Sequence, residues 1–166
     1  RMMNSMSGAD ESATFTDPAL AGPDFVIQGE YLGTVGPEEP GDAQSNQIAA
    51  QIISLGDGKF DGVLYGGGLP GAGWDSVTRF ALRGIRDGGV VRFTGVFGER
   101  LRFENPNFQG TIVDGVFRGN AEMFLNFADS SDFVMKKIHR TSPTSGAKPP
   151  PGAIVLFDGT NVDEWI

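Results

Sequence analysis

The residues best suited to bind a ligand lie in a glycine-rich stretch near the middle of the chain. Tyr65 precedes the run Gly-Gly-Gly-Leu-Pro-Gly-Ala-Gly, and Trp74 and Asp75 follow it. Glycines let the backbone approach a ligand closely, aromatic rings can stack on the apolar face of a sugar, and a carboxylate can bond a hydroxyl. The stretch therefore predicts a carbohydrate-binding site made by Tyr65, Gly68, Gly71, Trp74 and Asp75. A compact surface loop, with Trp74 packed down onto the domain, is the alternative interpretation.

Four acidic residues invite comparison with the carboxylate pairs of glycoside hydrolases: Glu30, Asp57, Asp61 and Asp75. Asp57 lies in a turn signal, Gly56-Asp57-Gly58, and Asp61 falls on the expected solvent face of a strand. Acids in such positions are usually solvated. The sequence therefore predicts no catalytic residue.

Metal and cofactor signals are weak. Asp87 and Asp114 lie in turns and offer oxygen atoms to a hard cation, but no loop has a regular Asp-x-Asp-x-Asp spacing. His139 is the one histidine, and no acid or nucleophile stands beside it as a partner for catalysis. The glycine run lacks the Lys-Ser/Thr ending of a phosphate loop. We expect neither a metal site nor a cofactor.

Composition excludes several classes of protein. The 166 residues contain no cysteine, which rules out disulfides, cysteine-based zinc sites and thiol nucleophiles. The formal net charge of −8 argues against sequence-independent binding to nucleic acid or anionic lipid. No apolar run approaches the roughly 18 residues that a membrane-spanning helix needs.

The elements that must position these residues are predicted to be short strands. Apolar residues alternate with polar ones in several segments. Gly56-Asp57-Gly58 is a short connection suited to a tight hairpin, and Asp114-Gly115 is a favoured two-residue hairpin turn. No segment has a 3.6-residue apolar period over helical length. We predict an all-β domain, an antiparallel sandwich or a small barrel, with strands at 24–34, 47–55, 59–65, 78–83, 90–94, 100–104, 108–113, 116–118, 122–127 and 132–138.

The domain organisation is predicted from changes in composition. Residues 1–22 lack periodicity and form a mobile leader, and residues 23–140 form the all-β domain. Residues 141–152, with three consecutive prolines, are typical of an extended interdomain linker. Residues 153–166 begin with the apolar run Ile154, Val155, Leu156 and Phe157, which we expect to be the first strand of a second domain.

The end of the chain resembles a known family. The run Pro-Pro-Gly-Ala-Ile-Val-Leu-Phe-Asp-Gly-Thr, with Trp165 after it, resembles the opening motif of the 3-keto-disaccharide hydrolase family, although Glu164 stands where glycine is common. The strand around Gly29, the loop with Trp74-Asp75 and the junction at residues 142–150 look like the module that precedes that domain in planctomycete-type proteins. The resemblance implies a secreted or periplasmic glycan-processing protein, whose hydrolase domain has a concanavalin-like β-sandwich fold and only its first strand in this chain.

Two functions are favoured by the sequence, and a third, that the domain is itself an enzyme, would need a convergent acid pair that the sequence does not specify. The first is a non-catalytic accessory domain, associated with carbohydrate and tethered to a glycan-processing hydrolase. The second is a structural or assembly module, in which the strand Ile154 to Phe157 pairs with a neighbouring copy or with the downstream hydrolase domain.

Overall fold

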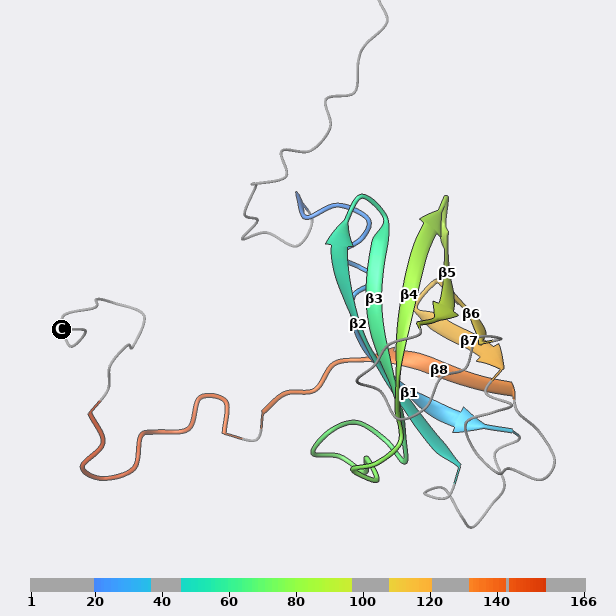
Figure 1. Ribbon diagram of the computed structural model, residues 1–166. Coiled ribbons are helices and arrows are strands. Elements are labelled where there is room, and N and C mark those ends of the chain that lie inside the picture. The colour runs from blue at the N-terminus through green and yellow to red at the C-terminus, as the bar shows by residue number, and fades with distance from the viewer. Residues whose placement is uncertain (1–19, 37–45, 97–107, 121–131, 143, 155–166) are drawn as a thin grey trace, which may run out of the picture.

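The chain folds into a closed barrel of eight antiparallel strands in sequential order (Figure 1). The structure, a computed structural model, describes residues 20–36, 46–96, 108–120, 132–142 and 144–154. The strands are β1 (Gly29–Val35), β2 (Gln47–Gly56), β3 (Lys59–Gly66), β4 (Arg79–Asp87), β5 (Val90–Gly95), β6 (Gln109–Val113), β7 (Val116–Asn120) and β8 (Asp132–Ile138). β1 pairs with both β2 and β8, which closes the barrel. The all-β prediction is confirmed, and of the two architectures left open the barrel is the one observed.

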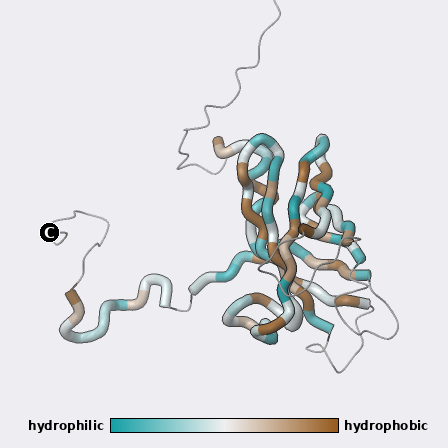
Figure 2. Tube along the Cα trace, in the orientation of Figure 1, coloured by the Kyte–Doolittle hydropathy of each residue, from teal (hydrophilic) through white to brown (hydrophobic). Residues whose placement is uncertain are grey.

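Hydrophobic and hydrophilic residues alternate along the described strands, as Figure 2 shows. The hydrophobic side chains of this alternation fill the interior of the barrel. Ile48, Ala50 and Ile52 of β2 point inward, as do Phe80 and Leu82 of β4. An eight-stranded barrel is just wide enough for side chains to fill it. Phe117 lies in the middle of this core, with its ring centroid 5.1 Å from that of Phe93. The interior is therefore a packed core.

Glycines at inward positions make room for the large rings. A Cβ atom on Gly84 would lie 2.5 Å from the ring of Phe93, and one on Gly119 would lie 2.7 Å from the ring of Phe133. Gly110 stands in the same relation to Phe117. The ring of a phenylalanine on one strand thus occupies the space that a side chain would take at the glycine of the neighbouring strand. Curved sheets commonly contain such pairs.

Two predicted hairpin turns are confirmed. β2 and β3 are joined by Asp57-Gly58, and β6 and β7 by Asp114-Gly115. All four residues have positive φ, from 47° at Asp114 to 72° at Gly115. This is the backbone of the tight turns that match the twist of an antiparallel pair. The predicted strands at 100–104 and 122–127 lie outside the described residues.

The start of the first predicted strand was wrong. Residues 24–28 form a tight turn, in which Ile27 N and Gln28 N both donate to the carbonyl of Asp24, and β1 begins only at Gly29. The reason is the Asp24 carboxylate, which accepts hydrogen bonds from Gly58 N (2.8 Å) and Arg86 Nε (2.6 Å). Short polar side chains that bond elsewhere draw the backbone away from strand pairing.

The predicted linker and C-terminal strand remain predictions. In the described part of 141–152 the chain is exposed, and backbone hydrogen bonds such as Ser145 N to Ser142 O form local turns. Residues 144–154 lead away from the barrel in Figure 1. Ile154 is 75% exposed, whereas Val155, Leu156 and Phe157 lie outside the described residues. The leader, apart from residues 20–22, lies outside them as well.

Candidate functional site

The glycine-rich loop connects β3 to β4 and is folded on itself. Gly67 N donates to Gln47 O (2.8 Å), Ala72 N donates to Leu69 O (2.8 Å), and Leu69 is buried. A Cβ atom on Gly67 would lie 2.6 Å from the carbonyl oxygen of Gly73. Close packing of two backbone segments therefore explains these glycines without a ligand.

The two glycines named in the predicted site differ from each other. Gly68 has a φ of 132°, and a Cβ atom there would strike the carbonyl oxygen of Ala72. Gly71 has a φ of 75°, and nothing lies within 4 Å of a Cβ atom placed on it. Gly68 belongs to the packed part of the loop, while Gly71 lies at its open tip.

Tyr65 and Trp74 form an aromatic pair at the base of the loop. Their ring centroids are 5.5 Å apart and their planes make an angle of 71°, an edge-to-face arrangement. Trp74 Nε1 donates to the carbonyl of Thr78 (2.9 Å), and the Tyr65 hydroxyl donates to Gln51 Oε1 (2.9 Å). Both residues are half-buried. The rings are thus held in fixed orientations and still reach the surface.

Asp75 holds the turn that enters β4. Its Oδ1 accepts hydrogen bonds from Val77 N (2.8 Å) and Thr78 N (2.6 Å). Burial raises the pKa of this carboxyl, but the hydrogen bonds from Thr78 and Val77 outweigh burial and leave the pKa lowered. The carboxylate is therefore already engaged with Thr78 and with the backbone of Val77, and a sugar hydroxyl would have to share it with them.

A polar network extends the aromatic pair across three strands. Gln51 Nε2 donates to Glu30 Oε1 (2.9 Å), and Arg140 donates to both carboxylate oxygens of Glu30 at 2.5 Å. Arg140 Nη1 also reaches the carbonyl of Pro70 in the loop (3.1 Å). The hydrogen bond from Arg140 lowers the pKa of Glu30 despite partial burial, so the carboxylate is charged near neutral pH. We call Tyr65, Trp74, Gln51, Glu30 and Arg140 the aromatic site.

Sequence reasoning missed Gln51 and Arg140 as members of this site. Their signal is the strand register, in which Glu30 stands opposite Gln51 and Tyr65 lies diagonally across from Gln51 on β3. Diagonal neighbours of this kind are within reach of long side chains. The sequence alone does not give that register.

Asp57 and Asp75, two of the acids considered as a carboxylate pair, do not come together. Asp57 lies at the turn before β3 and Asp75 lies beyond the end of β3, so the eight residues of that strand hold them roughly 25 Å apart. Asp61 pairs instead with Arg83 at 3.4 Å. His139 is exposed. Within the described ranges no cluster of three or more histidines, aspartates or glutamates could hold a metal ion.

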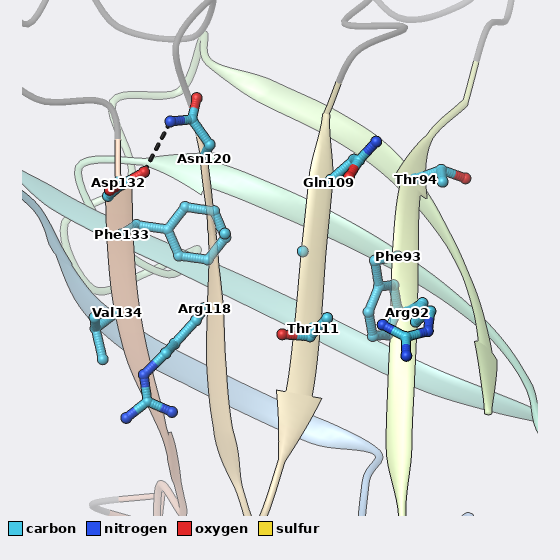
Figure 3. A pocket seen from close by; sticks show the side chains of 12 residues that line it. Arg92, Phe93, Thr94, Gln109, Thr111, Arg118, Asn120, Asp132, Phe133 and Val134 are labelled. Atoms are coloured by element: carbon cyan, nitrogen blue, oxygen red, sulfur yellow. Dashed lines mark hydrogen bonds between the residues drawn. The ribbon is translucent and has the colours of Figure 1, made fainter. Parts of the chain in front are cut away.

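A second candidate site is a groove of about 720 Å³ on the outer face of β5 to β8 (Figure 3). Its floor is the backbone of four inward-facing residues, and two rows of outward side chains border it. One row contains Arg92, Thr111, Arg118 and Val134, and the other contains Thr94, Gln109, Asn120 and Asp132. The sequence analysis did not predict this groove, because its residues come from four strands and align only in the folded sheet.

No helix in the described parts of the chain is long and apolar enough to cross a membrane. Compared with models of protein families, with curated proteins and with solved structures, the chain matches none.

Proposed function

We propose that this barrel is a non-catalytic, carbohydrate-binding accessory domain of a secreted glycan-processing hydrolase. The observation that supports binding is the aromatic site, in which two half-exposed rings lie beside an amide, a carboxylate and a guanidinium. Sugars present apolar ring faces and many hydroxyls, so they need aromatic surface together with planar hydrogen-bonding groups. The aromatic site supplies both.

The same geometry supports the non-catalytic part of the proposal. Glu30, the carboxylate of the site, is charged and held by Arg140 and Gln51. A general acid in glycoside hydrolysis needs a raised pKa and a second carboxylate within roughly 5–10 Å. The lowered pKa of Glu30 fits a binding group. The hydrolase connection and the export of the protein rest on the resemblance at residues 150–165.

Removal of the Trp74 side chain tests sugar binding. Isothermal titration calorimetry with neutral glucose disaccharides and short glucans should show saturable binding that weakens about five- to thirtyfold in Trp74→Ala, because one stacked ring contributes about 1–2 kcal/mol. Trp74→Phe, which keeps a ring, should lose less. Val77→Ala, a change at an exposed residue of the same loop, should bind like the parent protein.

The fold of Trp74→Ala needs checking, because Trp74 Nε1 also bonds Thr78 O. A parent-like circular dichroism spectrum and urea midpoint would show that the barrel is intact. Absence of binding to every neutral sugar tested would remove the carbohydrate proposal for the aromatic site.

The alternative is an assembly module that pairs the run Ile154 to Phe157 with another copy. Each of the eight barrel strands already pairs on both sides, so the barrel offers no edge for that run to join. Such pairing would have to be between the tails of two copies or with the downstream domain. The exposure of Ile154 supports the idea. Light scattering on chains ending at Lys148 and at Ile166 tests it, since equal monomeric masses would exclude self-association through this run.

A further inference from the structure

The groove on β5 to β8 has an uneven distribution of charge. Arg92 and Arg118 stand in one outward row, on either side of Thr111, and Asp132 stands in the other row. In Figure 3 the guanidinium group of Arg118 points away from the row that contains Asn120 and Asp132, and that of Arg92 lies at the level of Thr111. One end of the groove is therefore basic, and the other end offers amide, hydroxyl and carboxylate groups.

Neither arginine is neutralised within the described residues. The ion pairs there are Arg83–Asp61, Arg86–Asp24 and Arg140–Glu30, and none of them involves the groove. Arg92 and Arg118 are exposed, and Val134, the neighbour of Arg118 on β8, is 46% exposed and apolar. Two cations without a partner in the described structure, in a chain of net charge −8, attract an anionic group to this one face.

The strand spacing sets the length of the ligand. Two inter-strand steps separate Arg92 from Arg118, which places their Cα atoms about 10 Å apart. In Figure 3 the guanidinium groups of Arg92 and Arg118 lie apart from each other, so a single carboxylate does not meet both in this arrangement. An extended ligand with more than one acidic group can meet both.

The other row indicates which groups the rest of the ligand offers. Asn120 Nδ2 donates to Asp132 Oδ1 (2.8 Å), which fixes a carboxylate that accepts hydrogen bonds, and Gln109 offers both a donor and an acceptor. Hydroxyl groups of a ligand can both donate to the carboxylate and bond to the amide of this row. Anionic groups, whether phosphate or carboxylate, do not match this row, because the charge of Asp132 repels them.

We propose that this groove is a second binding site, which takes an acidic oligosaccharide whose carboxylates pair with Arg92 and Arg118 and whose hydroxyls meet Gln109 and Asp132. The choice of a sugar rests on the proposed function, whereas the site is distinct from the aromatic site. The domain would then bind two kinds of glycan on two faces, neutral sugar at Tyr65 and Trp74 and acidic sugar at the groove.

Titration with short oligogalacturonides, and with the same oligomers as methyl esters, tests the groove. The acid form should bind and the ester should bind at least about tenfold more weakly, because hydrogen bonds between charged groups contribute about 1.5–3 kcal/mol. Arg92→Gln and Arg118→Gln should each weaken binding of the acid form about tenfold and reduce its dependence on salt. Lys59→Gln, an equal charge change outside the groove lining, should leave binding unchanged.

The remaining outcomes separate this proposal from the proposed function. Trp74→Ala should lose neutral sugar and keep the acid form, whereas loss of both would place the acidic ligand on the aromatic site and overturn the groove. Unchanged binding in Arg92→Gln and Arg118→Gln would overturn it too. Equal binding of inorganic polyphosphate or single-stranded RNA would show a general polyanion surface and would also contradict an acidic-sugar site.

Discussion

At the scale of single residues, the chemistry of this protein depends on which polar groups are already engaged. Glu30 is held by Arg140 and Gln51, and one oxygen of Asp75 is held by backbone amides. Burial of Tyr31 raises the pKa of its hydroxyl to about 12, and that hydroxyl donates to Ile27 O at 2.6 Å. Tyr31 therefore acts as a neutral donor that ties the segment before β1 to the core.

Glu30 makes stability depend on pH in a defined direction. Its folded pKa is lowered from the ordinary value of 4.5, chiefly by the hydrogen bond from Arg140, so the unfolded chain binds the proton more readily. The stabilisation by Glu30 is complete above about pH 5. It is lost as the pH falls through the lowered folded pKa. Urea unfolding of the parent and of Glu30→Gln should differ most at neutral pH and converge in acid.

Asp61→Asn serves as the comparison for Glu30→Gln. The ion pair between Asp61 and Arg83 is 3.4 Å long and largely exposed, so its loss should change the free energy of unfolding by less than about 1 kcal/mol. A difference between parent and Glu30→Gln that grows as the pH falls would contradict the role assigned to the Arg140 hydrogen bond.

At the scale of elements, the segment before β1 holds two hairpins together at one end of the barrel. Asp24 bonds Gly58 N in the turn between β2 and β3, and it pairs with Arg86 near the end of β4. Lys137 of β8 donates to Val26 O (2.6 Å) in the same segment. The turn before β1 thus connects the β1–β8 pair to the β2–β3 turn and to the end of β4, although these elements are far apart in the sequence.

Asp24→Ala should destabilise the barrel by about 2 kcal/mol, because it removes a largely buried, charge-assisted pair and leaves Gly58 N without its acceptor. Asp24→Asn should cost less, since an amide oxygen can still accept from Gly58 N. A double-mutant cycle with Arg86→Gln would measure the coupling. Asp57→Asn is the control, as asparagine tolerates the φ of 51° in that turn. Zero coupling would show that the Asp24–Arg86 pair does not stabilise the fold.

At the scale of the whole molecule, closure between β1 and β8 decides the architecture. The two strands pair from Glu30–Ile138 to Val35–Phe133, and this pairing removes the edges that an open sheet would leave. Gly33 lies at the middle of the seam. A Cβ atom there would strike the carbonyl oxygen of Val134 and lie 2.7 Å from the Cα atom of Met135.

Gly33→Ala should therefore destabilise the protein by about 2–3 kcal/mol, because backbone rather than a flexible side chain must move. Gly89→Ala is the matched control, since nothing lies within 4 Å of a Cβ atom on Gly89 and its φ is not in the left-handed region. Urea unfolding measures the effect, and amide exchange should show β1 and β8 losing protection first in Gly33→Ala. Parent-like stability of that variant would mean that the seam is looser than the structure shows.

The sequence determined the strands, because alternation and turn residues act locally. Val90–Gly95, Gln109–Val113 and Asp132–Ile138 match their predicted segments within about two residues. The predicted start of the first strand was wrong, because the residues that bond to Asp24 and hold it in a turn lie 34 and 62 residues away in the sequence.

Only the tertiary structure decided closure and the composition of the sites. An alternating pattern gives each strand an inner and an outer face, but it leaves the register open, and register alone brings Gln51 to Tyr65 and Glu30. The same holds for the groove, where Arg92, Thr111 and Arg118 align from three strands. Local residue preferences therefore fix which segments become strands, whereas the packing of aromatic side chains inside a closed barrel fixes which outward residues meet.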